Sequence, residues 1–190
     1  MMKRIAIFAS GNGTNAENIC KYFENSNEIK VVLLCTNKKD AFVLNRIHKF
    51  NIPSIIFSKK NLNEEKTIEK TLSNYSVDFI VLAGFLLKIP KYLVNKYEKK
   101  IINIHPSLLP KHGGAGMYGD SVHESVLKSK DVESGVTVHY VNHKYDEGGI
   151  IFQKSCRVEK GETIKSLSKK VSELEYSFFP KIIEKVICLL

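Results

Sequence analysis

The first hundred residues alternate between short apolar runs and longer segments whose apolar positions recur every three or four residues. The short runs are typical of strands buried on both faces of a sheet, and the spaced pattern is typical of helices that cover such a sheet. Strands are therefore predicted at residues 4–9, 30–36, 55–57 and 77–83, and helices at residues 16–23, 41–50, 62–73 and 91–97. This alternation predicts an α/β fold with a mainly parallel central sheet and helices on both faces, in which ligands bind at the carboxyl ends of the strands.

The pattern changes after Lys100. We predict a strand at residues 101–105, a short helix at 120–128, two strands at 135–141 and 149–156, and a helix at 162–175. Pro180 is expected to start or bend a last helix, because proline lacks the amide hydrogen that continues one. No linker, repeat or low-complexity segment interrupts the chain, so a single domain over residues 1–190 is expected.

The composition is typical of a soluble globular protein, with 43% hydrophobic and 26% charged residues. No apolar run approaches the roughly 20 residues that a membrane helix needs, and the amino-terminal segment lacks the apolar core of a signal peptide. The cysteines are scattered without a Cys-x-x-Cys pair, which favours reduced thiols and a cytoplasmic protein. They are Cys20, Cys35, Cys156 and Cys188.

The net charge of +9 raises the question of a nucleic-acid partner, because a basic surface attracts phosphates. Of the 29 basic residues, however, only Arg4, Arg46 and Arg157 are arginines, and base-edge recognition favours arginine. The lysines are spread along the chain. We therefore expect no nucleic-acid partner, and an anionic small-molecule substrate would also suit this charge.

A glycine-containing turn follows the first predicted strand and precedes the first helix. Glycines let backbone amides approach an anion, and a helix amino terminus adds unpaired N–H groups, so phosphate is the natural ligand. The turn is not a Walker loop, because no Gly-Lys-Ser/Thr follows. Its sequence is Ser10-Gly11-Asn12-Gly13-Thr14-Asn15.

Two alternatives to this phosphate site stay open. Gly11-x-Gly13-x-x-Ala16 partly matches the dinucleotide fingerprint, but residues 36–39 lack the acid that would bind a ribose, although their lysine pair suits a 2′-phosphate. A nicotinamide enzyme is therefore one alternative. A tight turn capped by Asn or Thr is the other.

The strand at residues 101–105 ends in polar side chains. Asn103 and His105 point to the same face because side chains alternate along a strand, and they stand roughly 6–7 Å apart. An amide donor beside a potentially cationic imidazole suits the oxyanion that develops in acyl transfer, although a polar strand end is the simpler interpretation. Pro106 and Pro110 stop regular pairing, and the glycine-rich residues 113–119 suggest an adaptable binding loop.

A third polar group lies in the turn between the two late strands, within Tyr145-Asp146-Glu147-Gly148-Gly149. A lone Asp in such a turn usually has only a structural role in the turn. If Asp146 lies beside His105, it can orient the imidazole, raise its pKa and receive or relay a proton. A metal is not expected, because no histidine forms His-Glu-x-x-His or pairs with cysteine at ligand spacing. The histidines considered are His105, His112, His123, His139 and His143.

Taken together and in order, these segments resemble the phosphoribosylglycinamide formyltransferases, over nearly the whole chain and through residues 162–180. The Asn-x-His-Pro-Ser-Leu-Leu-Pro motif with a distal Asp marks folate-dependent formyltransferases, and the amino-terminal phosphate loop marks the glycinamide ribonucleotide branch. The matching segments are Ser10 to Asn15, Leu82-Ala83-Gly84-Phe85, Asn103 to Pro110 and Tyr145 to Gly148.

The resemblance implies a Rossmann-like formyltransferase fold, with a phosphate-binding half at residues 1–100 and a catalytic and folate-binding half at 101–190. It implies transfer of the formyl group of 10-formyltetrahydrofolate to glycinamide ribonucleotide, a step of purine (IMP) biosynthesis, without a metal. The expected partners are these two molecules, with no nucleic acid and no membrane, and the chain is expected to be a monomer or homodimer.

The resemblance also assigns residues to roles. The catalytic residues would be Asn103, His105 and Asp146, and Glu175 would contact the nucleotide substrate. The substrate phosphate would bind Gly11, Asn12, Gly13, Thr14 and Asn15. The folate would bind Phe85, Leu86, Leu87, Lys88, Ile89, Asn103, Val141, Asn142, His143 and Asp146.

Two departures from the family pattern concern these sites. Leu86-Leu87-Lys88 stands where many members carry Met-Arg after Gly-Phe, and residues 113–119 form a longer, more glycine-rich segment than in several relatives. The alternatives are a methionyl-tRNA formyltransferase and a formyltetrahydrofolate hydrolase, which would be expected to add a carboxyl-terminal or an amino-terminal domain. A non-catalytic nucleotide-binding module would leave Asn103, His105 and Asp146 unused.

Overall fold

A computed structural model describes residues 2–189 and divides into two compact units. The first unit comprises the chain up to Ile102 together with the segment that begins at Ile183. The second unit comprises Asn103–Ile182. The expectation of a single domain over residues 1–190 stays a prediction.

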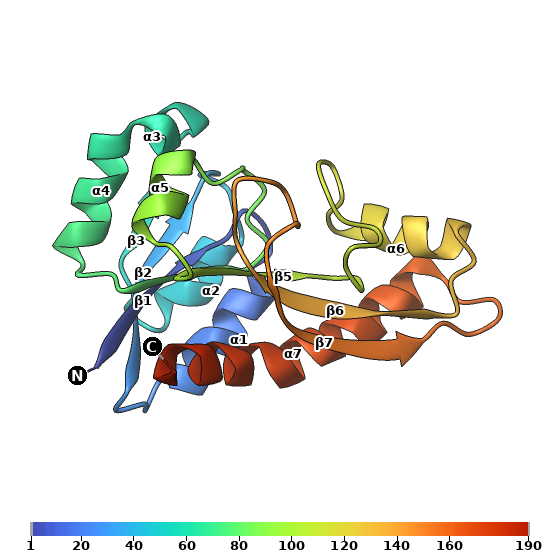
Figure 1. The fold of residues 1–190 in the computed structure, drawn as a ribbon. Coiled ribbons are helices and arrows are strands. Elements are labelled where there is room, and N and C mark those ends of the chain that lie inside the picture. Colours follow the sequence, from blue (N-terminus) through green and yellow to red (C-terminus); the bar gives the residue numbers. More distant parts are fainter. Residues whose placement is uncertain (1, 190) are drawn as a thin grey trace. The chain divides into compact units, whose positions relative to one another are not determined.

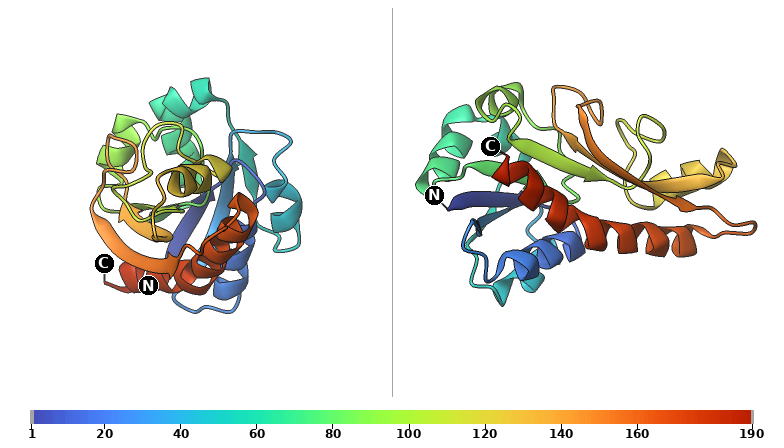
Figure 2. Two further views of the ribbon diagram at one scale, coloured as in Figure 1. Left: turned by 90° about the vertical axis from the view of Figure 1, so that its right-hand side faces the viewer. Right: turned by 60° about the horizontal axis from the view of Figure 1, so that its bottom comes forward.

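The first unit contains most of the alternating strands and helices. β1 pairs in parallel with β2 and β4, and β2 pairs in parallel with β3. In Figure 1, α1 and α2 lie on one face of these strands and α4 and α5 on the other, and Figure 2 shows the same arrangement from two further sides. The elements are β1 (Lys3–Phe8), α1 (Thr14–Phe23), β2 (Ile29–Thr36), α2 (Val43–His48), β3 (Ser54–Ile56), α3 (Lys59–Asn63), α4 (Glu65–Asn74), β4 (Phe79–Leu82) and α5 (Lys91–Lys96).

Burial explains why these strands read as continuous apolar runs. All four residues of β4 and the last four of β1 are buried, because helices cover both faces of the sheet. Phe8 and Phe79 are among the largest fully buried side chains. Burying one such side chain contributes about 1.5–3 kcal/mol, so this part of the sheet is the core of the first unit.

The helix predicted at residues 62–73 is in fact two helices. α3 ends at Asn63 and α4 begins at Glu65, because Glu64 adopts an extended conformation (φ −87°, ψ 94°). Ser58 caps α3: its hydroxyl accepts from the Asn61 amide, and the Asn61 side chain accepts from the Ser58 amide. The sequence prediction did not include this capping box, which fixes a start upstream of Leu62.

The second unit contains the later strands and two helices. Val126, Val136, Leu167 and Val171 form its buried hydrophobic cluster, which joins α6, β6 and α7. β6 and β7 pair antiparallel. The elements are β5 (Ile101–His105, of which the last three residues belong to this unit), α6 (Asp120–Lys128), β6 (Glu133–Tyr140), β7 (Ile150–Arg157) and α7 (Ile164–Cys188, which belongs to this unit up to Ile182).

Pro180 lies inside α7 and does not begin a separate helix. The predictions of a separate helix ending near Glu175 and of a new start at Pro180 are therefore wrong, because one helix of 25 residues covers both, and a bend at Pro180 stays a prediction. Proline removes one backbone hydrogen bond from a helix interior. Phe179 and Ile183, on either side of it, have no exposed surface, and their burial offsets that loss.

The seven strands follow the order β3-β2-β1-β4-β5-β6-β7. The predicted α/β fold with a mainly parallel sheet is confirmed, with the antiparallel β6–β7 pair at one edge. No helix formed by residues 2–189 is long and apolar enough to cross a membrane. The four cysteines are free, and Cys20 and Cys35 are buried.

Candidate active site

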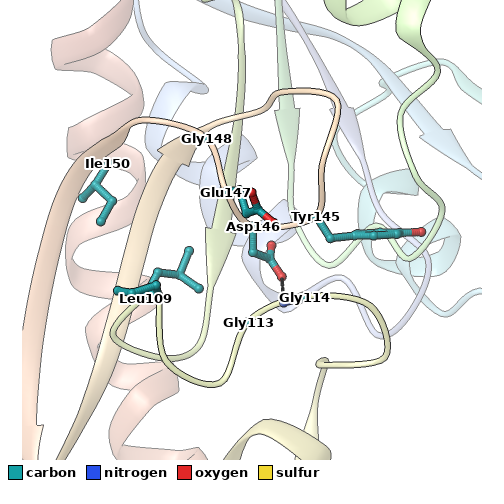
Figure 3. A pocket seen from close by; sticks show the side chains of 9 residues that line it. Leu109, Gly113, Gly114, Tyr145, Asp146, Glu147, Gly148 and Ile150 are labelled. Atoms are coloured by element: carbon teal, nitrogen blue, oxygen red, sulfur yellow. Dashed lines mark hydrogen bonds between the residues drawn. The ribbon is translucent and has the colours of Figure 1, made fainter.

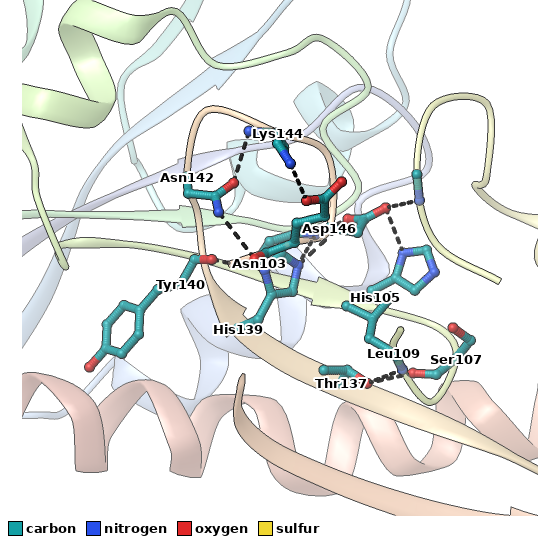
Figure 4. Close-up of polar contacts among 12 residues, drawn as sticks. Asn103, His105, Ser107, Leu109, Thr137, His139, Tyr140, Asn142, Lys144 and Asp146 are labelled. Atoms are coloured by element: carbon teal, nitrogen blue, oxygen red, sulfur yellow. Dashed lines mark hydrogen bonds and ion pairs between the residues drawn. The ribbon is translucent and has the colours of Figure 1, made fainter. Parts of the chain in front are cut away.

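The second unit brings Asn103, His105 and Asp146 together. The Asn103 Nδ2 lies 3.5 Å from one carboxylate oxygen of Asp146, and the His105 Nδ1 lies 3.6 Å from the other. Asn103 and His105 therefore share one face of β5, as strand alternation predicted, and Asp146 reaches that face from the turn after β6 (Figure 4). The sequence spacing alone left this proximity open.

Asp146 is held as a carboxylate. Its backbone is left-handed (φ 54°), and its Oδ2 accepts a hydrogen bond of 2.9 Å from the Gly114 amide (Figure 3). Burial raises the pKa of Asp146, but the His139 and His105 rings and the Gly114 amide outweigh it, so the pKa is lowered overall. The glycine-rich loop, whose contacts the sequence did not assign, thus orients this carboxylate.

His105 is 3% exposed, and its two ring nitrogens face different partners. Nε2 lies 2.8 Å from the backbone carbonyl oxygen of His112. A carbonyl only accepts, so Nε2 carries the proton and Nδ1 faces Asp146 with its lone pair in the neutral ring. Burial lowers the pKa of His105, and the Asp146 carboxylate and the His112 carbonyl only partly oppose this, so the resting ring is neutral near neutral pH.

His139 is a site residue that the sequence analysis considered only as a metal ligand. It is 2% exposed, and its Nδ1 lies 2.9 Å from the Tyr140 carbonyl oxygen. In the neutral ring Nδ1 therefore donates, and Nε2 accepts from the Asn103 amide 3.1 Å away. This contact turns the Asn103 NH₂ group toward Asp146. Strand alternation places His139 on the same face of β6 as Thr137, and this alternation is the signal by which the sequence could have identified His139 as a site residue.

The segment after β5 is fixed by polar contacts to β6 and β7. The Thr137 hydroxyl donates to the Ser107 carbonyl (2.6 Å) and accepts from the Leu109 amide (3.0 Å). The Gln153 side chain donates to the Leu109 carbonyl (2.9 Å). Because Thr137 has no exposed surface, these bonds form away from water, and they hold the chain where it leaves His105.

A cavity of about 610 Å³ opens beside Asp146 (Figure 3). A Cβ atom on Gly113 would lie 2.4 Å from the Leu109 side chain and 3.2 Å from the Asp146 Cβ, so only glycine lets this loop approach so closely. The volume lies within the range of small-molecule sites. The cavity is lined by Leu109, Pro110, Gly113, Gly114, Tyr145, Asp146, Glu147, Gly148 and Ile150.

The turn that carries Asp146 is stiffened by Asn142. Its side chain accepts from the Lys144 amide (2.8 Å) and donates to the Glu147 carbonyl (3.1 Å). Val141 and Asn142 are partly buried, whereas His143 is exposed. The three residues predicted to bind folate here therefore lie in one ordered turn next to Asp146, and their contact with folate stays a prediction.

The predicted phosphate loop lies in the first unit, at the amino terminus of α1. Three of its carbonyl groups are bound within the protein: Gly11 to the Val43 amide (3.1 Å), Gly13 to the Glu17 amide (2.9 Å), and Asn12 to the Arg46 Nε (2.8 Å). No side chain caps α1. The carbonyl side of the loop thus faces the protein, and the helix end presents N–H groups without a side-chain cap.

Arg46 was not singled out by the sequence analysis as part of this loop. Besides its bond to the Asn12 carbonyl, its guanidinium lies 3.1 Å from the Asn12 Oδ1 and 2.7 Å from the Glu17 carboxylate. Lys49 and Lys21 also pair with Glu17, and these cations together lower the pKa of Glu17 to about 2. A planar fork of donors thus ties Asn12 of the loop to Glu17 on α1, which a single ammonium could not do.

Gly13 also has a structural role, which the sequence of the loop did not indicate. Its φ is +78°, and a Cβ atom there would lie 2.3 Å from the Val43 side chain, whereas a Cβ on Gly11 meets nothing within 4 Å. Gly13→Ala is therefore expected to lower the free energy of unfolding by roughly 2–4 kcal/mol, from left-handed strain and overpacking.

Gly11→Ala is the matched control in a urea titration, because it is expected to change the stability by less than about 1 kcal/mol. Equal stability of the two variants would show that packing against Val43 does not require Gly13. A selective loss of nucleotide affinity in stable Gly11→Ala would instead assign the phosphate to the loop.

The predicted folate segment Phe85–Ile89 also lies in the first unit. Ser10 ties it to the end of β1: its amide donates to the Gly84 carbonyl (3.0 Å), and its hydroxyl accepts from the Leu86 amide (2.9 Å). Phe85, Leu86 and Leu87 are partly buried, Lys88 is exposed and Ile89 is buried. The structure thus brings this segment to the phosphate loop, since both follow parallel strands.

Two further predictions concern Glu175 and metals. Glu175 lies on α7 in the second unit and is partly buried, and its contact with substrate stays a prediction. Within residues 2–189, no group of three or more His, Cys, Asp or Glu side chains could hold a metal ion. The His105 and His139 rings near Asp146 are used in hydrogen bonds to backbone carbonyls and to the Asn103 amide.

The chain is similar to known proteins over nearly its whole length. Residues 3–183 match the formyl transferase family. Phosphoribosylglycinamide formyltransferase of Bacillus subtilis (strain 168) is 35% identical, covering 99% of this chain and 96% of that protein. The chloroplastic phosphoribosylglycinamide formyltransferase of Arabidopsis thaliana is 39% identical, and the match covers 95% of this chain but only 64% of the longer plant protein.

Solved structures agree with this similarity. Glycinamide ribonucleotide transformylase 1 from Geobacillus kaustophilus has a TM-score of 0.89 and 33% identity, covering 98% of this chain and all of that one. Phosphoribosylglycinamide formyltransferase from Bacillus halodurans has a TM-score of 0.88 and 34% identity, covering 97% and 95%. The predicted fold and family are confirmed: this chain belongs to the formyl transferase family, as a relative of the phosphoribosylglycinamide formyltransferases.

Proposed function

We propose that this chain transfers the formyl group of 10-formyltetrahydrofolate to the amine of glycinamide ribonucleotide, a step of de novo purine biosynthesis. The relatives that it matches along its length carry the corresponding name. The observation that carries the proposal is the cluster of Asn103, His105 and Asp146, because it offers an amide donor, a neutral imidazole and a carboxylate on one face. A nucleotide-binding module would have no use for this cluster.

The reaction requires partners for two opposite charges. The amine attacks the formyl carbon, so negative charge develops on the formyl oxygen while the attacking nitrogen becomes cationic and must lose a proton. Asn103 is assigned to the oxygen as a neutral donor: one of its N–H groups is held by His139, and the other makes a long contact of 3.5 Å with Asp146 that the formyl oxygen would replace. Such a preorganised donor is typically worth about 3 kcal/mol in the transition state.

His105 and Asp146 are assigned to the proton. The neutral His105 takes the amine proton on Nδ1, which faces Asp146, and the resulting imidazolium is stabilised by that carboxylate. The proton then passes to the folate nitrogen as the carbon–nitrogen bond to folate breaks. The amino-acid sequence suggested a cationic His105. In the proposed mechanism this is the state reached after attack, when the positive charge of the ring also stabilises the oxyanion.

The substrates are assigned to the two predicted regions. The nucleotide phosphate would bind the amides of residues 11–15 at the amino terminus of α1, and Glu175 would contact the same substrate. The pterin would bind Phe85–Ile89 and the turn 141–146 through backbone hydrogen bonds and apolar contacts. Leu87→Asp is expected to raise the KM for folate at least tenfold with little change in the KM for nucleotide, as steady-state kinetics would measure.

The decisive experiment follows 10-formyltetrahydrofolate spectrophotometrically with and without glycinamide ribonucleotide, and identifies the nucleotide product by mass spectrometry. Consumption that requires the nucleotide and yields its formylated form supports the proposal. Consumption that is independent of the nucleotide would identify a formyltetrahydrofolate hydrolase. Tight nucleotide binding without any turnover would favour a binding module.

The pH dependence tests the charge state of His105. The Asp146, His139 and His112 groups face it, and its pKa is lowered, mainly by burial. Its basic form is therefore expected to persist below about pH 6.5, the ordinary value, and the turnover number to fall only as the pH drops through the lowered pKa. His105→Asn should lack this acid limb. A rate that falls as pH rises through that same range would instead require a cationic resting His105.

A further inference from the structure

We propose that His112, anchored by Ser125 and Asp131, is a positioning residue that fixes which ring nitrogen of His105 carries the proton. The inference rests on the proposed function, in which the His105 Nδ1 takes the proton of the attacking amine. It goes beyond it by assigning a task to three residues outside the Asn103, His105 and Asp146 cluster.

The His112 ring is fixed at both nitrogens. Nδ1 lies 2.8 Å from the Ser125 hydroxyl on α6, and Nε2 lies 3.0 Å from an Asp131 carboxylate oxygen. The side chain is only 10% exposed and that of Asp131 is 19% exposed, so water competes little for either bond. Hydrogen bonding by His112 is the main cause that lowers the pKa of Asp131, which keeps the anchor ionised.

These anchors hold the backbone of His112 in an unusual conformation. Its φ is +55°, in the left-handed region that costs a side-chain-bearing residue about 1–2 kcal/mol. In this conformation its carbonyl oxygen lies 2.8 Å from the His105 Nε2. Two side-chain hydrogen bonds offset the backbone strain, and the carbonyl becomes a fixed acceptor for the His105 proton.

The fixed carbonyl matters because the neutral His105 ring has one proton and two acceptors near it. The Asp146 carboxylate, 3.6 Å from Nδ1, attracts the proton to Nδ1, whereas the His112 carbonyl, 2.8 Å from Nε2, attracts it to Nε2. The shorter contact is within hydrogen-bonding distance and the longer one is not. The His112 carbonyl therefore leaves the Nδ1 lone pair free to accept a proton, and a ring protonated at Nδ1 could not serve as this base.

Lys111 provides a matched control on the same anchor. Its ammonium lies 3.2 Å from the Asp131 carboxylate, but the side chain is 67% exposed. Its backbone carbonyl accepts from the Ser107 hydroxyl (2.7 Å), a contact that a side-chain substitution leaves in place. Lys111→Ala therefore removes a charge from Asp131 without touching the bond between Asp131 and His112.

The experiment compares Asp131→Ala, His112→Gly and Lys111→Ala by ¹⁵N NMR of the histidine rings and by steady-state kinetics. Glycine at position 112 tolerates the left-handed backbone, so this variant removes the ring without adding strain. We expect a neutral His105 protonated at Nε2 in the unchanged chain and in Lys111→Ala. In Asp131→Ala and His112→Gly the population protonated at Nδ1 should rise.

The kinetic counterpart is a fall in kcat of about 10- to 100-fold in those two variants, with the KM of each substrate within about twofold. Asp131→Asn, which keeps an oxygen acceptor for Nε2 of His112, should restore most of the rate. Lys111→Ala should keep the kcat of the unchanged chain. If circular dichroism shows that Asp131→Ala is unfolded, the same NMR and kinetic measurements on His112→Gly and Ser125→Ala decide the question.

Three outcomes would overturn the inference: a neutral His105 protonated at Nδ1 in the unchanged chain, an unaltered tautomer in His112→Gly, or a shifted tautomer with an unaltered kcat. The NMR result does not depend on catalysis. Failure of the proposed function would appear separately, as absence of nucleotide-dependent formyl transfer in the unchanged chain with its His105 protonated at Nε2.

Discussion

Asp146→Asn is expected to lower the turnover number by a factor of about 10²–10⁴ while leaving the affinity for the nucleotide nearly unchanged. The substitution keeps the size of the side chain and removes its charge, so the imidazolium that forms when His105 takes the amine proton loses its counterion 3.6 Å away. Asn can still accept from the Gly114 amide, so the loop keeps its anchor. The measurement is single-turnover formyl transfer with saturating substrates.

His105→Asn is expected to cause a loss of similar size, and the double variant to lose much less than the product of the two. The two side chains act on one proton, and residues that act as a unit are non-additive. Glu124→Gln on α6, an exposed carboxylate that pairs with Lys128, is the matched control and should turn over normally. Multiplicative losses would contradict the coupled assignment, and normal turnover in either single variant would remove the residue from the mechanism.

Much of the fold could be predicted from the sequence because the strands at the centre of the sheet are buried on both faces. Residues 4–9, 30–36 and 77–83 read as strands for that reason, and β5 and α6 have the predicted bounds. The break at Glu64 and the continuation of α7 through Pro180 were missed. The separate α3 depends on a local capping box, and the continuation of α7 depends on the burial of Phe179 and Ile183, and the pattern of apolar residues resolves neither.

The site could be predicted only in part. Side chains that share a strand face were predicted, whereas contacts made by backbone groups were not. Strand alternation placed Asn103 and His105 on one face. The turn singled out Asp146, but its spacing left the proximity to His105 open, and the family resemblance supplied the shared role. The groups that orient these side chains are the Gly114 amide and the His112 carbonyl, and backbone groups carry no sequence signature of their partners. His139 was visible as a histidine, but its partner Asn103 lies 36 residues away in the chain.

Asn103→Ala is expected to lower the turnover number by a factor of about 10²–10³, because it removes the neutral donor assigned to the formyl oxygen. The His139 Nε2 lies 3.1 Å from the Asn103 amide nitrogen and holds it in place. His139→Phe should therefore give a smaller loss in the same direction, since it frees the amide to turn without removing it. The substrate KM values should change little in both variants, as steady-state kinetics would show.

A comparison of Asn103→Ala with Asn103→Leu separates a donor role from a packing role for Asn103. If Asn103 only fills space on β5, Asn103→Leu should restore turnover, because leucine has a similar volume and no donor. If Asn103 stabilises the oxyanion, Asn103→Leu should remain as slow as Asn103→Ala, and a tetrahedral-intermediate analogue should bind both variants about 100-fold more weakly, in proportion to the loss of rate. An analogue that binds Asn103→Ala as tightly as the unchanged chain would show that the formyl oxygen has another partner.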